Sequence, residues 1–332
     1  MSIVNTFSLQ SNRQIKINFD GGDLSSDAGL LLIKEFISKL GIERLLNRSF
    51  KTNDSAVFRY HTDRDNLLQM IYMIMAGYFE DDASDELTKD PIFFNRMDED
   101  TLKQFQEISQ ILRKRIYSIQ MPQAVILDLA STLLAAYGKQ EGRAFNFHYR
   151  SNGYHPLVCY DGITGDLIKI QLRDGAAYSC TGVTDFLQPI LDEYLNDYPT
   201  IHLLLRGDSG FATPDLYKQC EENGTSYVIR LMENFIKESK SGFDFSAVSS
   251  HNRIVNANRV QVHALAYNIF NWFRRLVLSA KMRKQRIDTV RLKLLKIATK
   301  VVHSARYITF KLCSSCPYGK CFKDILNTLY SN

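Results

Sequence analysis

The chain has 332 residues, of which 45% are hydrophobic and 23% charged, and these proportions are typical of soluble globular proteins. This length suits one large domain or two of ordinary size. The N-terminus is polar, and the most apolar run, which begins at Leu67, is too short to cross a bilayer. We therefore expect a cytoplasmic protein with neither a signal peptide nor a membrane anchor.

The net charge of +5 is unevenly distributed along the chain. Residues 251–332 contain sixteen Lys or Arg and two acidic residues, which gives this part a net charge of +14 and leaves −9 on the remainder. A basic segment on an acidic body is typical of proteins that bind a polyanion, most often nucleic acid. A solvated helical face would have the same composition, so both interpretations stay open.

Residues 1–120 are expected to form a helical N-terminal region. In the segment SSDAGLLLIKEFISKLGI, Ser26 or Asp27 can cap a helix whose apolar stripe ends at Gly41. A second helix is predicted in the segment that begins DNLLQMIYMIMAGYF, which is apolar nearly all round and therefore buried.

Residues 121–250 predict alternating strands and helices. Short apolar runs with β-branched residues indicate strands, and periodic segments with caps indicate helices. In chain order these segments are the strand AVILDLAST, the hairpin HPLVCYDGITGDLIKIQL, the helix TGVTDFLQPILDEYLNDY, the strand IHLLLRGD, the helix TPDLYKQCEENG, the strand SYVIRL and a helix from MENFIKESK. Three antiparallel strands followed by strand–helix units predict an α/β fold with a ribonuclease H-like mixed sheet.

Residues 251–332 are expected to form a basic helical C-terminal region. The segment VNANRVQVHALAYNIFNWFRRLVL predicts a long apolar helix, and cationic and apolar residues interleave after it. Lys293, Lys296 and Lys300 are three and four residues apart, so on a helix they would share one face.

Two acidic residues in the predicted core have positions that are typical of catalytic or ligand-binding residues. Asp208 directly follows the fourth strand, between Gly207 and Gly210, and open α/β sheets place ligand crevices at such strand ends. An Asx-turn is the alternative explanation for Asp208. Glu233 opens the helix after the fifth strand, and Lys240 follows two turns later on the same face. The helix dipole would also favour a carboxylate at Glu233.

A third carboxylate, Asp128, lies inside the apolar first strand. Its burial costs free energy unless a cation or hydrogen-bond donor meets it. The first and fourth strands are neighbours in the predicted sheet, so Asp128 is expected to approach Asp208. Clustered carboxylates repel, and hard oxygen ligands favour Mg²⁺ or Mn²⁺, ions that can activate a nucleophilic oxygen at phosphorus.

The chain resembles the DDE transposases of bacterial insertion sequences, in particular insertion sequence family 1380. The resemblance spans most of the chain and rests on the segments DGGDLSSDAGLLL, YGKQEGRAFNFHYRSNGYHPLVCYDGITGDL, LLLRGDSGFATPDLY, MENFIKESKSGFDF and NANRVQVHALAYN. It implies DNA cleavage and strand transfer at element ends that depend on Mg²⁺, with Mn²⁺ as a substitute. It also implies that the partners are terminal-repeat and target DNA, with a possible homodimer, and that the location is the bacterial nucleoid.

The family motif implies site residues at particular positions of this chain. Its second acidic residue corresponds to Asp208, its glutamate to Glu233, and its lysine to Lys240. The first acidic residue would stand at Ala130 in D-L-A-S-T, where only the preceding Asp128 remains. We therefore keep Asp128, with Asp208 and Glu233, as a candidate metal ligand and catalytic residue.

The resemblance further implies a long insertion before the glutamate helix, which this chain lacks because YVIRL runs directly into MENF. We expect an internally deleted copy with impaired activity, in which the N-terminal helices are a candidate region for binding DNA ends. Other DNA contacts are expected at Lys237, Arg253, Arg259, Arg274, Arg275, Lys293, Lys296 and Lys300. The alternatives are a non-catalytic DNA-binding remnant and a ribonuclease H-like nuclease that only hydrolyses.

Overall fold

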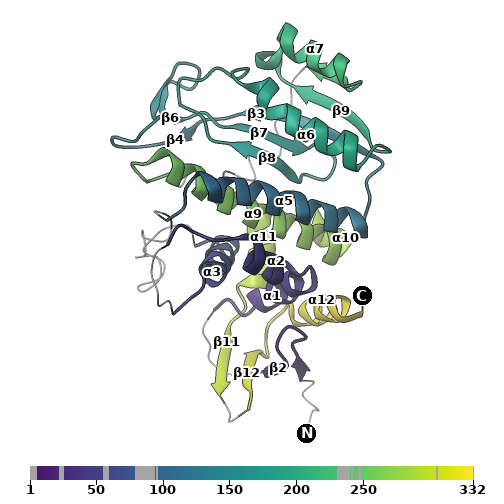
Figure 1. Ribbon diagram of the computed structural model, residues 1–332. Coiled ribbons are helices and arrows are strands. Elements are labelled where there is room, and N and C mark those ends of the chain that lie inside the picture. Colours follow the sequence, from purple (N-terminus) through teal and green to yellow (C-terminus); the bar gives the residue numbers. More distant parts are fainter. Residues whose placement is uncertain are drawn as a thin grey trace.

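The structure is a computed structural model, and it describes residues 6–21, 26–54, 60–78, 94, 96–229, 240, 242–245, 248–303 and 306–331. In Figure 1 the described elements form successive layers. A central sheet lies at one end, two long helices run beneath it, and shorter helices separate them from a small sheet at the opposite end.

The central sheet has five strands in the order β10-β9-β3-β7-β8. Within this sheet, β7 pairs antiparallel with both β3 and β8. By contrast, β9 pairs parallel with β3, and β10 pairs parallel with β9. Their bounds are β3 (Ala124–Ser131), β7 (Leu157–Asp161), β8 (Leu167–Gln171), β9 (His202–Gly207) and β10 (Ser226–Ile229). The five strands predicted for this region are confirmed, as is the pairing of the first strand with the fourth.

Strand β3 shows why the central sheet forms where it does. Val125, Leu127 and Leu129 are buried on one face, and Asp128 lies on the other, only partly buried face. This alternation of two residues places the acidic side chain beside the neighbouring strands without forcing it into the apolar core.

A second, three-stranded sheet follows β3 and was not predicted. Its order is β4-β6-β5, with bounds β4 (Leu134–Ala135), β5 (Ala144–Asn146) and β6 (Ser151–Tyr154). The strands are too short to show a period of two residues in the sequence, which explains why they escape prediction.

Four helices surround or link the strands of the central sheet. These are α5 (Glu99–Ile119), α6 (Val183–Asp197), α7 (Pro214–Glu222) and α9 (Arg253–Val277). Helix α6 connects β8 to β9, and α7 connects β9 to β10, as strand–helix units require. Thr213 caps α7 by accepting a hydrogen bond from the Leu216 amide, and Pro214 is the first residue of the helix.

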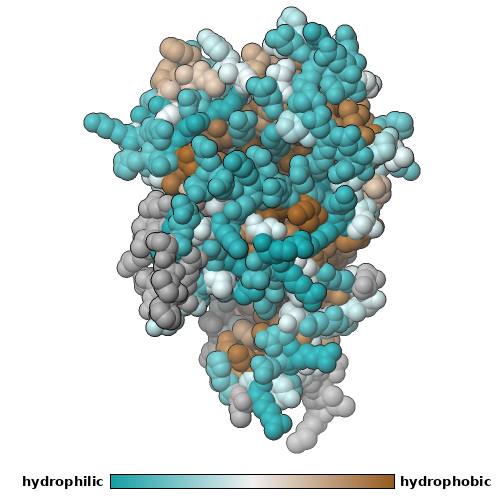
Figure 2. Space-filling view, viewed as in Figure 1, coloured by the Kyte–Doolittle hydropathy of each residue, from teal (hydrophilic) through white to brown (hydrophobic). Residues whose placement is uncertain are grey.

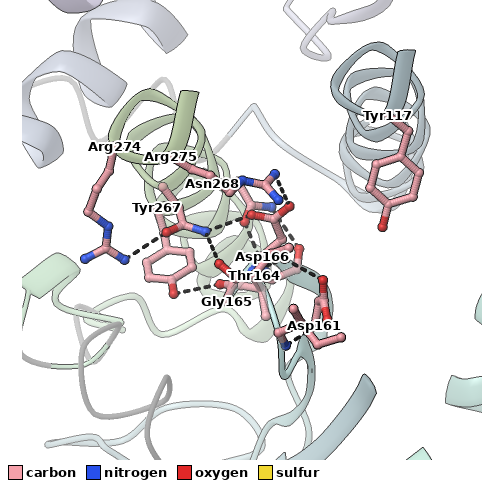
Figure 3. Close-up of polar contacts among 12 residues, drawn as sticks. Tyr117, Asp161, Thr164, Gly165, Asp166, Tyr267, Asn268, Arg274 and Arg275 are labelled. Atoms are coloured by element: carbon pink, nitrogen blue, oxygen red, sulfur yellow. Dashed lines mark hydrogen bonds and ion pairs between the residues drawn. The ribbon is translucent and has the colours of Figure 1, made fainter. Parts of the chain in front are cut away.

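Helix α9 is held to the β7–β8 turn by polar side chains (Figure 3). Asn268 exchanges two hydrogen bonds of 2.8 Å with the backbone of Leu167. The Tyr267 hydroxyl donates to the Gly165 carbonyl, and the Asn271 amide donates to Asp166 at 2.7 Å. A helix that is apolar on most sides thus meets the sheet in one defined register, because buried polar groups need partners.

The remaining short elements lie in the N- and C-terminal parts of the chain, except η2, which directly follows Asp208 after β9. They are α1 (Leu30–Lys39), α2 (Ile42–Ser49), α3 (Asp63–Ala76), the 3₁₀ turn η2 (Ser209–Phe211), α10 (Ala280–Arg283), α11 (Ile287–Val290), the π-helical turn η3 (Arg291–Leu295) and α12 (Gly319–Ser331).

The expectation of purely helical terminal regions is wrong for part of both ends. Strands β1 (Phe7–Ser8) and β2 (Ile15–Gly21) form one sheet with β12 (Ile308–Cys313) and β11 (Thr299–His303), in the order β1-β2-β12-β11. β2 and β12 are parallel and come from opposite ends of the chain. Residues 299–313 are rich in β-branched residues, which favour strands. Their pairing with a distant strand therefore outweighs the helical spacing of Lys293, Lys296 and Lys300.

Candidate functional site

Asp208 continues the extended backbone of β9 past its last residue, with φ −80° and ψ 177°. Its Oδ1 accepts a hydrogen bond of 2.8 Å from the Gly210 amide and caps η2. A Cβ at position 210 would lie 2.9 Å from this oxygen, so the tight turn requires glycine there. The Asx-turn that was the alternative explanation for Asp208 is therefore present.

Asp128 forms a two-pronged ion pair with Arg206 of the adjacent strand. Arg206 Nε donates to Asp128 Oδ1 at 2.8 Å, and Nη2 donates to Oδ2 at 2.6 Å. The two residues lie directly opposite each other in the β3–β9 ladder. The hydrogen bond to Asp128 raises the pKa of Arg206. Both carboxylate oxygens of Asp128 thus have a cationic partner inside the chain.

A glycine makes room for this ion pair. A Cβ at Gly162 would lie 2.9 Å from Nη2 of Arg206 and 3.1 Å from Cβ of Ile126. The Gly162 amide donates to the Ile126 carbonyl at 2.8 Å, which fixes the β7–β8 turn against β3. A larger residue here would push the guanidinium away from Asp128.

Ala130 is the position on β3 that faces Asp208. The parallel register pairs Ala124 with His202 and Asp128 with Arg206. Continuing it by two residues brings Ala130 level with Asp208, on the same face as the ion pair. By this extension of the register, Ala130 would be the β3 residue nearest Asp208.

Lys240 also lies at the carboxyl end of β3. Its Nζ donates to the Leu133 carbonyl at 2.9 Å and to Thr132 Oγ1 at 3.3 Å. The structure thus brings Asp128, Asp208 and Lys240 to one end of the paired strands β3 and β9. Glu233 and Lys237 lie outside the described residues.

Polar residues that the sequence did not single out surround this end of the sheet. The hydroxyls of Ser131 and Ser179 are 2.9 Å apart, and the Cβ of Ser179 would lie 3.0 Å from a Cβ at position 210. His155 donates from Nδ1 to the Ala177 carbonyl at 2.7 Å, and burial lowers its pKa. His155 lies between β6 and β7, and the sequence does not distinguish it from other residues of a strand connection.

The described residues do not supply a complete divalent-ion site. No group of three His, Cys, Asp or Glu side chains within them is arranged to hold a metal ion. Asp128 is engaged by Arg206, and Ala130 offers no ligand. Asp208 remains as the described carboxylate at the strand end.

The four α9 arginines expected to bind DNA lie against other groups of the chain. Among these contacts, Arg253 and Arg275 each form an ion pair with a carboxylate. Their partners are Asp174 for Arg253 (3.8 Å), the Phe94 ring for Arg259 (4.3 Å), Asn271 for Arg274 (2.8 Å) and Asp166 for Arg275 (2.8 Å). Burial raises the pKa of Asp166, and the positive charge of Arg275 opposes this shift. Arg275 therefore compensates a buried carboxylate, and Figure 3 shows the two side chains together.

Lys293, Lys296 and Lys300 do not share a helical face, contrary to expectation. Lys293 lies in η3, Lys296 directly follows it, and Lys300 is an exposed residue of β11. The Nζ of Lys296 lies 2.9 Å from Oδ1 of Asp27 and 3.7 Å from the centre of the Tyr78 ring. Strand pairing after η3 turns these side chains in different directions.

Comparison with known proteins gives one family and one solved structure. The sequence model of transposase DDE domain group 1 matches residues 7–99, 93–234 and 231–331. The chain is similar, at 12% identity and a TM-score of 0.37, to a piggyBac transposase solved by cryo-EM as a synaptic complex with hairpin DNA. That similarity covers 80% of each chain. None of the curated proteins matches, and none of the helices within the described ranges could span a membrane.

Proposed function

This chain belongs to the transposase DDE domain family, group 1, and we propose that it descends from an Mg²⁺-dependent DNA transposase of insertion sequence family 1380. Divalent metal ions are typical of this family, with Mn²⁺ as the usual substitute for Mg²⁺. The ancestral activity is DNA cleavage and strand transfer at the ends of an insertion sequence. We propose that the activity is impaired in this copy, because Ala130 stands where the family motif has its first acidic residue.

The proposed catalytic core is ribonuclease H-like and corresponds to residues 121–250. The strand order β10-β9-β3-β7-β8, with three antiparallel strands followed by two parallel ones, supports this assignment. Residues 1–120 and 251–332 flank the core as terminal regions for DNA ends. Asp208 then lies at the strand end where such a sheet exposes its ligand crevice.

The position of Ala130 is the observation that carries the proposal. The β3–β9 register ends with the pair Asp128–Arg206, and continuing it by two residues would bring Ala130, where the family motif has its first acidic residue, level with Asp208. We assign Asp128, which shares that face, the role of holding Arg206 in place. Glu233 is proposed as the third acidic residue, with Lys240 beside it.

An internal deletion accounts for the second departure from the family. The family model matches the chain in separate pieces, and two of them meet at residues 231–234, directly after β10 ends at Ile229. Residues 230–239 are too few to hold a long β-rich insertion. We propose that the lost segment supplied DNA contacts near Glu233.

DNA is the proposed partner, through the insertion sequence ends and the target. The +14 charge of residues 251–332 supports this choice. Lys300 and Lys311 lie directly opposite each other in the β11–β12 ladder, so two of these positive charges are neighbours on one sheet. Lys237 and Lys293 are further candidates, whereas the Arg275 ion pair limits its part in binding.

The test uses DNA carrying the terminal repeats of the element, with Mn²⁺ present. We expect the natural chain to bind this DNA without nicking it, and Ala130→Asp to restore nicking. Ala130→Asp combined with Asp208→Ala should be inactive again. If Ala130→Asp binds the DNA and never nicks it, the proposed site is wrong.

A non-catalytic DNA-binding remnant is the second candidate, and the Asp128–Arg206 ion pair favours it because it removes one carboxylate from the site. For this function, binding should weaken steeply with salt, since each neutralised phosphate releases counterions. Nicking without strand joining would instead identify a ribonuclease H-like nuclease.

A further inference from the structure

Exposed aromatic rings gather around the three-stranded sheet β4-β6-β5. We call Tyr137, Phe145, Phe147 and Tyr178 the aromatic platform. Phe147 is 86% exposed, Tyr137 84% and Tyr178 80%, whereas rings of this size are usually buried. Figure 2 shows apolar atoms at the surface above the β4 and β6 end of the molecule.

The platform is anchored on residues that adjoin the candidate site. Tyr149, two residues after Phe147, donates from its hydroxyl to the carbonyl of Ser131, the last residue of β3. Its ring packs edge-on against His155, with 5.8 Å between ring centres. His155 in turn feels the negative charge of Asp208, which partly offsets the burial that lowers its pKa.

The segment that carries Tyr178 is fixed in the same place. Arg173 is buried and donates from Nη1 to the carbonyls of Tyr178, Ser179 and Thr181. The neighbouring Ser179 adjoins both the end of β3 and the turn after Asp208. Tyr178 is therefore an exposed ring on a well-ordered loop beside Asp208.

The sheet is also tied to that loop at its other end. Asn146, between the two phenylalanines of the platform, donates to the Gly175 carbonyl at 2.9 Å. Gly175 packs so closely on the sheet that a Cβ there would lie 2.1 Å from the Gly153 carbonyl oxygen. The rings on the β5–β6 turn and on the loop are thus held on one rigid support.

Cationic side chains interleave with these rings, while the acidic ones are engaged elsewhere. Residues 137–150 contain the cationic Lys139, Arg143 and Arg150 and a single acid. That acid, Glu141, accepts a hydrogen bond of 3.2 Å from the backbone amide at the start of α9. Positive charge between exposed rings is complementary to a nucleic acid strand, whose phosphates and bases alternate.

We propose that the aromatic platform binds single-stranded DNA by stacking unpaired bases beside Asp208. The proposal rests on the DNA transposase function proposed above, and it adds the form of DNA that the site receives. Phe145 touches Phe147 edge-on, with 5.2 Å between ring centres, and most of the Phe147 ring remains open to a base. A protein partner would favour a continuous apolar patch, and cations interrupt this one.

The experiment measures fluorescence anisotropy of a labelled oligothymidine of about 20 nucleotides and of a duplex of equal length, with EDTA present. We expect Phe147→Ala with Tyr178→Ala to weaken single-strand binding by about tenfold or more, because two stacked bases are lost. Duplex affinity should change by less than about twofold, because phosphate contacts remain.

Matched variants separate stacking from other effects. Phe147→Tyr should keep single-strand affinity, whereas Phe147→Leu, which is apolar but not aromatic, should lose it. Tyr60→Ala removes a fully exposed ring at another place in the chain and should change nothing. Equal affinity of the Leu and Tyr variants, or full affinity of the double Ala variant, would overturn the proposal.

Two further outcomes are distinguishable from failure of the transposase function. If sedimentation shows self-association that Phe147→Ala abolishes, the platform is an interface between copies and the proposal is wrong. Because EDTA excludes metal chemistry from the binding assay, failure of the Ala130→Asp variant to nick DNA would leave the single-strand result unaffected. Retained duplex binding without single-strand binding would reject the platform alone.

Discussion

The Asp128–Arg206 ion pair gives a quantitative prediction about which aspartate is structural. The perturbations are Asp128→Asn and Arg206→Met, singly and together, in a double-mutant cycle. The side chains of Asp128 and Arg206 are 13% and 31% exposed, and two hydrogen bonds of 2.8 and 2.6 Å join them. The pair is thus intermediate between surface and buried ion pairs.

The expected magnitude follows from that intermediate burial. Exposed pairs contribute about 0–1 kcal/mol, and breaking a buried pair costs about 3–5 kcal/mol. With two charge-assisted hydrogen bonds and partial solvent access to Arg206, we expect a coupling energy of about 1–2 kcal/mol. Urea denaturation of the four proteins measures it, provided that each unfolds in a single transition.

Measurements of unfolding free energy and of Mn²⁺ binding together decide whether Asp128 is structural. If Asp128 is structural, Asp128→Asn lowers the free energy of unfolding but leaves Mn²⁺ binding by the Ala130→Asp variant intact. A coupling energy near zero, together with loss of Mn²⁺ binding on Asp128→Asn, would show that Asp128 is a metal ligand instead.

Three further predictions concern stability. Asp208→Ala should lower the free energy of unfolding by no more than about 1 kcal/mol, because its carboxylate caps one short turn, and a large fall in melting temperature would give Asp208 a mainly structural role. Arg275→Met should cost about 3–5 kcal/mol near pH 8 and less near pH 5. Burial raises the pKa of Asp166, so acid neutralises the carboxyl left without its partner; an equal loss at both pH values would contradict this reasoning. Burial alone would raise the pKa of Asp27, but hydrogen bonds from Tyr78 and Lys296 outweigh it, so the pKa is lowered overall. Its stabilising contribution is therefore present above the usual value of 3.8 and lost as the pH falls below it. Asp27→Asn should flatten the acid limb of the denaturation curve, and an unchanged limb would exclude the ion pair as its cause.

The sequence predicts the central sheet well because each strand is a separate apolar run. Asp208 can be placed from sequence because a strand end is a local feature with a known location in an open α/β sheet. The pairing of the first and fourth strands follows from the order of elements. These features depend on short windows of sequence and on general rules of connection.

The parts that sequence cannot give depend on long-range pairing and register. β2 pairs with β12 across nearly the whole chain, and no window of residues contains both. Asp128 meets Arg206 only because the β3–β9 ladder puts them opposite each other. The cationic spacing around Lys296 predicted one helical face, and the strand that follows overrides it.

The aromatic platform could not be predicted from the sequence for a similar reason. Phe147 and Tyr178 are far apart in sequence, and the Asn146 and Arg173 hydrogen bonds bring their segments together. The sequence also gives no indication that these rings are exposed, since aromatic residues in apolar segments are more often buried.

Mn²⁺ binding to the Ala130→Asp variant, followed by electron paramagnetic resonance of the free ion, is the most direct test of the candidate site. We predict that Ala130→Asp binds Mn²⁺ more tightly than the natural chain and that adding Asp208→Ala removes the gain. No gain in the Ala130→Asp protein, or a gain that survives Asp208→Ala, would contradict the assignment of positions 130 and 208 to one metal site.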